Sequence, residues 1–382
     1  MPMQATHTTM LVALASAATL ATNTDSCVSM ENKQGIYVTP LSIGTPYQTV
    51  DVAVDTGSYD LLLASTLCQQ PSCRKHARFD PEASSSFELT TVNGDALAAT
   101  LRYGQGEAVA VLGRDRVGLG TVSPPDVAEG AASPAGSAEG AASVTVTSEV
   151  DAMDMLLMQS NQLKDFGVSE YDGVMGLGKR NITDTAQRAL LSRLAVDSFS
   201  VCLGPIGLDG TMGLGGRLDL GSGLPGLDFV PLKSVGQQAW ASPLTFIGPH
   251  RGRTSMTGRA EAVRASAAGA ATCSAGGGCG AIIDSGTTLL TLPQQVYDSV
   301  MGAIDAHCPL ESCLNTIATR ETCDGQHFDA LPALELELGG RSLSLLPSAY
   351  MAPVDVSIPA YARLGPFYFA TYVEGIRCVP LL

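Results

Sequence analysis

The segments VAVDTGS at residues 52–58 and AIIDSGTT at residues 281–288 decide the interpretation of this chain. Each is a short apolar stretch that runs into an aspartate, a small hydroxyl residue, a glycine and a second hydroxyl residue. One copy is a weak signal, because Asp and Gly after a strand usually only make a turn. Two copies, with Asp55 in the first half and Asp284 in the second, indicate two related lobes that each contribute one carboxylate.

Two carboxylates held together cannot both ionise easily, so one keeps a proton and the pair titrates as a unit. Such a pair can hold a water molecule. The ionised member removes a proton from the water as it attacks a peptide carbonyl, and the protonated member donates to the developing oxyanion. Asp55 and Asp284 are therefore the candidate catalytic residues, and the sequence offers no convincing Ser-His or Cys-His arrangement.

The residues next to each aspartate have expected supporting roles. Gly57 and Gly286 let the backbone turn tightly and approach the carboxylates. Ser58 and Thr287 are expected to donate hydrogen bonds to the outer carboxylate oxygens and so fix the carboxylate planes.

Thr56 and Ser285 are expected to reach across to the backbone of the opposite loop. These crossed contacts would lock the two halves of the site together.

Composition favours a globular, sheet-rich protein. The 382 residues carry a net charge of −15 with a pI near 4.6, and such an acidic surface repels nucleic acid. A hydrophobic content of 45% is enough for a buried core, and 41 Gly with 21 Pro indicate many turns. Alternation at Val50, Val52 and Val54 predicts a strand, as do residues 87–101 and 109–117, whereas helices are expected only at 185–195 and 293–304.

The start of the chain resembles a leader. Residues 10–21 read MLVALASAATLA, so residues 1–21 are expected to be a signal peptide, followed by a short segment at 22–34. Ten cysteines then favour disulfides in a secreted chain. Zinc is the alternative use of these cysteines, but the five histidines lack paired ligand spacing, so no metal is predicted. His76, His250, His307 and His327 are expected at the surface. Asn181 begins an Asn-Ile-Thr sequon and is the candidate glycosylation site.

Two stretches are biased in composition. Residues 124–143 contain AEGAAS twice, and residues 251–280 are first basic and then rich in Ala and Gly. Neither has apolar periodicity, so both are expected to be surface inserts.

Together these motifs make the chain resemble the pepsin-like aspartic endopeptidases. The motifs that carry the resemblance are IGTP at 43–46, Cys68 and Cys73, FDP at 79–81, SSSF at 84–87, YGQG at 103–106, YDGVMGLG at 171–178, LPAL at 331–334 and PSAY at 347–350. The form of the second motif looks closer to plant-type, algal, protist or memapsin-like members than to stomach pepsins. The resemblance implies an all-β bilobal fold, with an N-terminal lobe at 35–205, a C-terminal lobe at 206–382 and a cleft between them.

The resemblance also assigns roles to further residues. Tyr103, Gly104 and Gln105 match the flap that closes over bound peptide. The substrate-binding set implied by the resemblance is Gly57, Tyr103, Gly104, Gln105, Gly286 and Thr288. The implied disulfides are Cys68–Cys73 and Cys323–Cys378.

Two departures from the family pattern stand out. Leu62 occupies the position of a tryptophan that normally supports the flap tyrosine by a hydrogen bond, which puts the position of Tyr103 in doubt. The chain stops at Leu382, before the segment that would brace the second catalytic loop, so the C-terminal lobe is expected to be incomplete.

The expected function is an aspartic endopeptidase of the secretory pathway, either extracellular or in an acidic vacuolar or lysosomal-like compartment. It would act at acidic pH on polypeptides as a monomer, without cofactor, metal or nucleic acid, and with a membrane anchor only if a missing C-terminal tail carried one. Two alternatives remain: a non-catalytic binding or inhibitor protein on the same fold, and an inactive truncated product.

Overall fold

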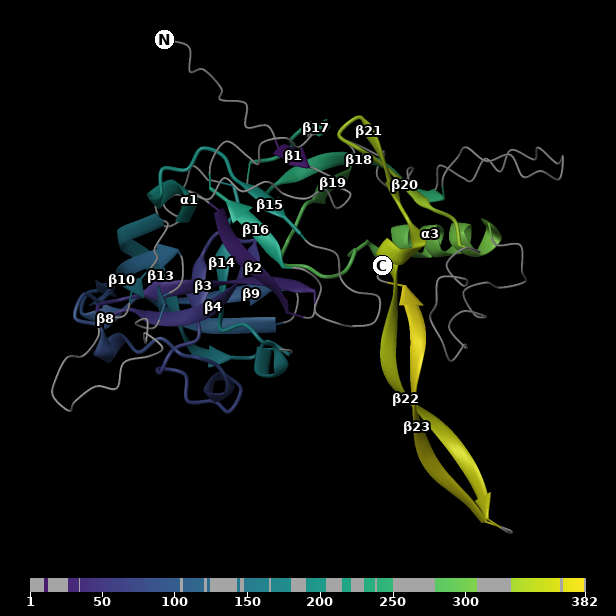
Figure 1. Cartoon of the computed structure of the whole chain (residues 1–382), viewed down its shortest axis with the longest axis horizontal. Helices are drawn as coiled ribbons and strands as arrows, with labels where there is room; N and C mark the ends of the chain where they lie inside the picture. Colours follow the sequence, from purple (N-terminus) through teal and green to yellow (C-terminus); the bar gives the residue numbers. More distant parts are fainter. Residues whose placement is uncertain are drawn as a thin grey trace, which may run out of the picture.

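The structure is a computed structural model. It describes residues 10–12, 27–33, 35–103, 106–119, 122–123, 143–144, 148–164, 166–179, 190–203, 215–220, 230–237, 239–249, 279–307, 331–364 and 367–380. Strands dominate these residues and helices are few (Figure 1), which confirms the predicted all-β class. Within these ranges, no helix combines the length and the hydropathy needed to span a bilayer.

The larger sheet belongs to the first part of the chain. Its strands run in the order β15-β16-β2-β3-β4-β14-β5-β13-β10-β6, and β9 also pairs with β10. Their bounds are β2 (Cys27–Lys33), β3 (Ile36–Ile43), β4 (Gln48–Asp55), β5 (Leu61–Leu63), β6 (Glu88–Leu89), β9 (Ala98–Tyr103), β10 (Gly106–Leu119), β13 (Ser148–Asn161), β14 (Gly173–Gly176), β15 (Ser200–Cys202) and β16 (Gly216–Asp219). The helical segments of this part are η1 (Cys73–Lys75), η2 (Pro81–Ala83), η3 (Phe166–Val168) and α1 (Leu190–Arg193).

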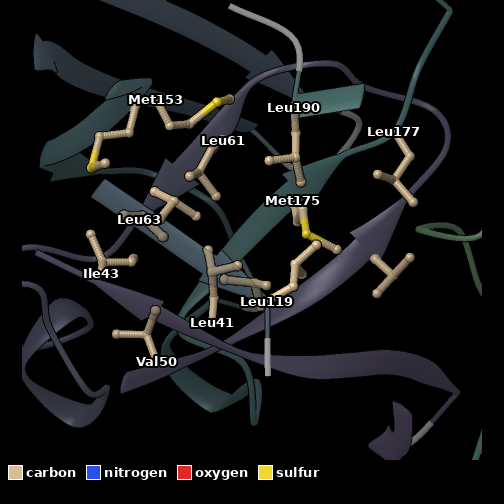
Figure 2. Close-up of a cluster of buried hydrophobic side chains, with 14 of the residues drawn as sticks. Leu41, Ile43, Val50, Leu61, Leu63, Leu119, Met153, Met175, Leu177 and Leu190 are labelled. Carbon is tan, nitrogen blue, oxygen red and sulfur yellow. The ribbon is translucent and has the colours of Figure 1, made fainter. Parts of the chain in front are cut away.

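The core of this sheet follows from the alternation in β4. Val50, Val52 and Val54 are buried in one apolar cluster, as the period of two predicts. Neighbouring strands contribute further side chains to the cluster, and Figure 2 shows Leu41, Val50 and Leu63 among the residues that gather there. Strand β4 ends at Asp55, directly after the buried Val54.

Strand β4 is held on both sides. It pairs antiparallel with β3, where Thr39 lies opposite Val52. On its other side it pairs in parallel with β14, where Gly176 lies opposite Asp55. The first aspartate is therefore the last residue of a strand that is hydrogen-bonded along both edges.

A smaller sheet forms in the second part of the chain, with the strand order β19-β18-β20-β21. Its elements are β18 (Ala241–Pro249), β19 (Cys279–Ile282), β20 (Leu334–Leu338) and β21 (Arg341–Leu345). Helix α3 (Gln294–His307) covers it with Val296, Val300 and Ile304, which recur every four residues and so share one helix face. These three side chains cluster with Ile247 and Leu334 of the sheet.

The remaining strands form two-stranded pairs. They are β1 (Met10–Val12) with β17 (Val230–Leu232), β7 (Thr91–Val92) with β8 (Asp95–Ala96), β11 (Val122–Ser123) with β12 (Ser143–Val144), and β22 (Met351–Leu364) with β23 (Phe367–Pro380). Helix α6 (Pro347–Tyr350) precedes β22, and the long β22–β23 hairpin runs away from both sheets in Figure 1.

The strand expected at residues 87–101 is interrupted, which corrects that prediction. Asn93 and Gly94 have φ values of 55° and 91° and form the two-residue turn between β7 and β8. Asn-Gly is the preferred pair for such a hairpin turn, because both of its residues need positive φ. Two separate parts of this range, β6 and β9, pair with β10 as expected.

Of the two expected helices, one is confirmed and the other is described only in part. The one at 293–304 is confirmed as α3, which continues to His307. Of the one at 185–195, α1 supplies only Leu190–Arg193, and residues 180–189 lie outside the described ranges.

Several other predictions fall largely outside the described residues. These include most of the inserts 124–143 and 251–280, and most of the leader 1–21, of which β1 is described. The division into lobes near residue 205 stays a prediction. The strands on either side of it, β15 and β16, pair with each other, and β16 pairs with β2.

Candidate active site

Asp55 lies at the end of β4 and its carboxylate is fixed by its own loop. The backbone N–H of Gly57 donates to Oδ1 at 2.8 Å, and the hydroxyl of Ser58 donates to Oδ2. The carbonyl of Asp55 accepts from the N–H of Leu177 at 2.7 Å, one residue beyond β14. The side chain of Asp55 thus has a single orientation, set by its loop and by the neighbouring strand.

Asp284 follows β19 and has the same pattern of partners. The N–H of Gly286 donates to its Oδ1 at 2.8 Å, and the hydroxyl of Thr287 donates to its Oδ2 at 2.8 Å. The two loops therefore repeat each other residue for residue, as the two sequence motifs predict.

Thr56 and Ser285 cross between the loops. The hydroxyl of Thr56 donates to the carbonyl of Ile283 at 2.8 Å and accepts from the N–H of Ser285 at 3.0 Å. In return, the hydroxyl of Ser285 donates to the carbonyl of Val54 at 2.6 Å and accepts from the N–H of Thr56 at 3.1 Å. Four hydrogen bonds thus join the end of β4 to the end of β19.

The glycines show that the two carboxyl groups face each other. A Cβ on Gly57 would lie 2.5 Å from Oδ2 of Asp284, and a Cβ on Gly286 would lie 2.5 Å from Oδ1 of Asp55. Any side chain at either position would occupy the space of the opposite carboxylate. Both positions therefore require glycine because of close approach.

The electrostatics of the pair favour a shared proton. Burial raises the pKa of Asp55 to about 6, and the charge of Asp284 together with a hydrogen bond from it acts in the same direction. The bonds from Ser58 and Gly57 act against this rise. Asp55 therefore keeps a proton to a higher pH than an ordinary aspartate.

The two aspartates differ in their surroundings. Asp55 is 8% exposed, whereas Asp284 is only half-buried and Ile282 beside it is 58% exposed. The difference arises because β4 has strands on both edges, whereas β19 pairs in the described part of the chain with β18 alone.

The expected flap is described at Tyr103 but not at Gly104 and Gln105. Tyr103 ends β9, lies opposite Gly106 in β10 and packs against the apolar cluster that contains Leu62. Burial raises the pKa of the Tyr103 hydroxyl, and the nearby charges of Asp55 and Asp60 add to the rise. Leu62 thus supports the region of Tyr103 by apolar packing, where the family pattern has a hydrogen bond.

The other predicted residues lie apart from the carboxylates or outside the described residues. Thr288 is exposed, and a Cβ on Gly35 would lie 2.6 Å from its Cγ2. Cys68 and Cys73 form the expected disulfide, and Cys279 is disulfide-bonded too. The pair Cys323–Cys378 stays a prediction, since Cys323 is outside the described ranges. Glycosylation at Asn181 stays a prediction for the same reason.

His76 corrects the expectation that the histidines lie at the surface. Its side chain is 3% exposed, its ring lies 4.1 Å from that of Phe166, and its Nε2 contacts the carbonyl of Phe166 at 2.7 Å. Its Nδ1 lies 3.5 Å from Asp172, whose carboxylate also accepts from the N–H of Asp51 in β4. Within the described residues, no group of three or more His, Cys, Asp or Glu side chains is placed to hold a metal ion.

Sequence reasoning assigned no role to Trp240 and included Leu177 only as part of the YDGVMGLG segment, yet both contact the catalytic loops. Leu177 donates its N–H to Asp55, and the carbonyl of Trp240 accepts from the N–H of Ile283 at 2.8 Å. Trp240 is the only tryptophan of the chain. The sequence signal for Trp240 is a single tryptophan placed directly before a segment with alternating apolar residues.

Known proteins resemble this chain over most of its length. The family model that matches is that of the eukaryotic aspartyl proteases, over residues 36–361. Among similar proteins, pepsin A of Sus scrofa is 27% identical over 333 residues, which is 84% of this chain and 70% of the pepsin. Pepsin A of Suncus murinus is 28% identical over 82% of this chain and 68% of its own length, and that of Gallus gallus is 25% identical over 88% and 76%. The chain belongs to the eukaryotic aspartyl protease family of pepsin-like, aspartic-type endopeptidases.

Proposed function

We propose that this protein hydrolyses peptide bonds by means of a water molecule held between Asp55 and Asp284. The observation that carries the proposal is the mutual approach of the two carboxyl groups, each oriented by a glycine N–H and a hydroxyl of its own loop. Carboxylates at such close quarters share a proton and supply a base and an acid together.

In the proposed reaction the two aspartates divide the proton transfers. Asp55, whose pKa is raised by burial, holds the shared proton, and Asp284 serves as the base. As water attacks the carbonyl carbon, Asp284 takes a proton from the water and Asp55 gives its proton to the carbonyl oxygen. A neutral tetrahedral diol results.

Breakdown of the diol restores the starting state. Asp284 passes its proton to the nitrogen, the C–N bond breaks, and Asp55 recovers a proton from a hydroxyl of the diol as the new carboxylic acid forms. The buried, preorganised hydrogen bonds around each carboxylate lower the cost of these transfers, because no dipole has to reorient.

The raised pKa of Asp55 sets the expected pH range. The mechanism needs one proton on the pair, and that proton is lost as the pH rises through about 6. We therefore propose action in an acidic compartment of the secretory route or outside the cell. The disulfide between Cys68 and Cys73 supports an oxidising environment.

The test is cleavage of a quenched fluorescent peptide by the full chain, produced under oxidising conditions and assayed between pH 3 and 7. Acid-dependent cleavage that is blocked by a statine-type transition-state mimic is expected. Asp55→Asn and Asp284→Asn should each abolish cleavage, whereas Asp95→Asn on the exposed strand β8 should leave it unchanged. Binding of the mimic without cleavage would instead favour a non-catalytic binding protein.

A further inference from the structure

Trp240 lies directly before β18 and its indole reaches the first part of the chain. The Nε1–H donates to the carbonyl of Leu177 at 2.7 Å, and the indole packs edge-on against Phe199 with the ring centroids 5.5 Å apart. The backbone carbonyl of Trp240 accepts from the N–H of Ile283 at 2.8 Å. One residue thus bonds to both halves of the candidate site.

These bonds close a circuit around the two catalytic loops. Asp55 accepts from Leu177, Leu177 accepts from the indole of Trp240, and Trp240 accepts from Ile283. Ile283 in turn accepts from the hydroxyl of Thr56, which is covalently next to Asp55. Since Ile283 is covalently next to Asp284, a movement of either aspartate backbone strains a bond that involves Trp240.

Lys179 holds the indole in place. Its ammonium group lies over the Trp240 ring, 5.5 Å from the ring centroid, donates to the hydroxyl of Ser234 and contacts the carbonyl of Gly236 at 3.4 Å. Burial lowers the pKa of Lys179. A partly desolvated cation on an aromatic face is more strongly attracted to it than a solvated one. The ammonium therefore restricts the indole to the orientation that donates to Leu177.

We propose that Trp240, clamped by Lys179, is a positioning residue that sets the separation of Asp55 and Asp284. The proposal rests on the proposed function, because it assigns the separation of the pair a part in peptide hydrolysis. Trp240 bonds to Leu177 and Ile283, and Lys179 contacts the indole, so both residues act on the aspartates through Leu177 and Ile283.

The simpler alternative is that Trp240 only adds stability between the two halves. A purely stabilising residue would change the unfolding midpoint but leave turnover unchanged well below that midpoint. A positioning residue changes turnover in the folded enzyme, because a displacement of about 1 Å in a catalytic group costs on the order of a hundredfold in rate.

Substitutions at two positions separate these cases in the full chain. Trp240→Phe keeps an aromatic ring next to Phe199 but deletes the N–H donor to Leu177. Lys179→Met keeps the aliphatic stem but deletes the charge, and Lys179→Arg restores a cation that can stack on the indole. The matched controls are Tyr47→Phe, which deletes an exposed hydroxyl donor to Glu149, and Lys164→Met at an exposed lysine.

The kinetic result expected is a fall in kcat of about tenfold to a hundredfold in Trp240→Phe, with KM changed by less than about twofold. The kcat of Lys179→Met should also fall, and that of Lys179→Arg should return most of the way to the wild-type value. Both controls should have the kcat of the wild type. A kcat for Trp240→Phe within twofold of an active wild type would overturn the proposal.

A second readout does not require activity. In Trp240→Phe, hydrogen exchange of the amides at residues 283–288 should accelerate relative to both the wild type and Tyr47→Phe. The fluorescence of Trp240, the only tryptophan, should become more accessible to acrylamide in Lys179→Met than in Lys164→Met. Unchanged exchange and unchanged quenching would overturn the proposal. If the wild type cleaves no peptide but both signals change, the proposed function fails while the coupling of the loops stands.

Discussion

At the scale of single residues, Asp55 and Asp284 are identical side chains in unequal surroundings. Both receive a glycine N–H and a hydroxyl bond, yet Asp55 is 8% exposed and Asp284 is half-buried. Burial is the largest cause of the raised pKa of Asp55. The local motif therefore determines the orientation of each carboxylate, and the packing of β4 determines the proton affinity of Asp55.

The raised pKa predicts a pH-dependent effect of Asp55→Asn on stability. The folded-state pKa of about 6 lies above the ordinary 3.8, so the stability from protonated Asp55 is complete below 3.8 and is lost as the pH rises through 6. Asparagine stays neutral, so its advantage over the wild type should grow from near zero at pH 3 to on the order of 2–3 kcal/mol at pH 7. Urea unfolding at several pH values measures this, with Asp95→Asn as control. A difference that does not vary with pH would contradict the assignment.

Gly57 is predicted to tolerate no side chain. In Gly57→Ala the new Cβ would lie 2.5 Å from Asp284, so one carboxylate must move. We expect cleavage to fall by about a hundredfold or more, since a shift of about 1 Å has that effect. Gly302→Ala in α3 is the control, because its Cβ would meet no atom within 4 Å. It should leave cleavage unchanged and raise stability by about 0.5–1 kcal/mol. Equal activity in Gly57→Ala would show that the carboxyl groups do not face each other.

At the scale of elements, the crossed bonds of Thr56 and Ser285 join β4 to β19. Thr56→Val preserves shape but removes the donor to Ile283 and the acceptor for Ser285. We expect a loss of about 1–3 kcal/mol in urea unfolding, because partly buried partners stay unpaired, and lower turnover as well. Thr56→Ser keeps the hydroxyl and should retain most of the stability and most of the turnover. If valine and serine behave alike, the hydroxyl does not join the loops.

Sequence patterns predicted the elements that carry strong periodicity. The valines of β4 and the apolar positions of α3 repeat with periods of two and about four, and both elements formed as expected. The expected strand at 87–101 is broken at Asn93 because the Asn-Gly pair adopts positive φ at both residues. The burial of His76 could not be predicted, because it depends on Phe166 and Asp172, about ninety residues further along the chain.

At the scale of the whole molecule, the repeated motif predicted that two distant segments would meet. The four bonds between residues 54–56 and 283–285 join segments that lie in different sheets. No sequence motif predicts the bond between Trp240 and Leu177, because this bond depends on how the two sheets approach each other. Patterns within a segment are readable from sequence, whereas contacts between sheets require the packed structure.

The central claim is that Asp55 and Asp284 act as one unit, and a double-mutant cycle tests it most directly. The rate of peptide cleavage at acidic pH is measured for the wild type, Asp55→Asn, Asp284→Asn and the double variant, with folding checked by urea unfolding. A pair that shares one proton is disabled by the loss of either member, so each single variant should be as inactive as the double variant. Losses that multiply independently, or a single variant with full activity, would contradict a shared-proton pair.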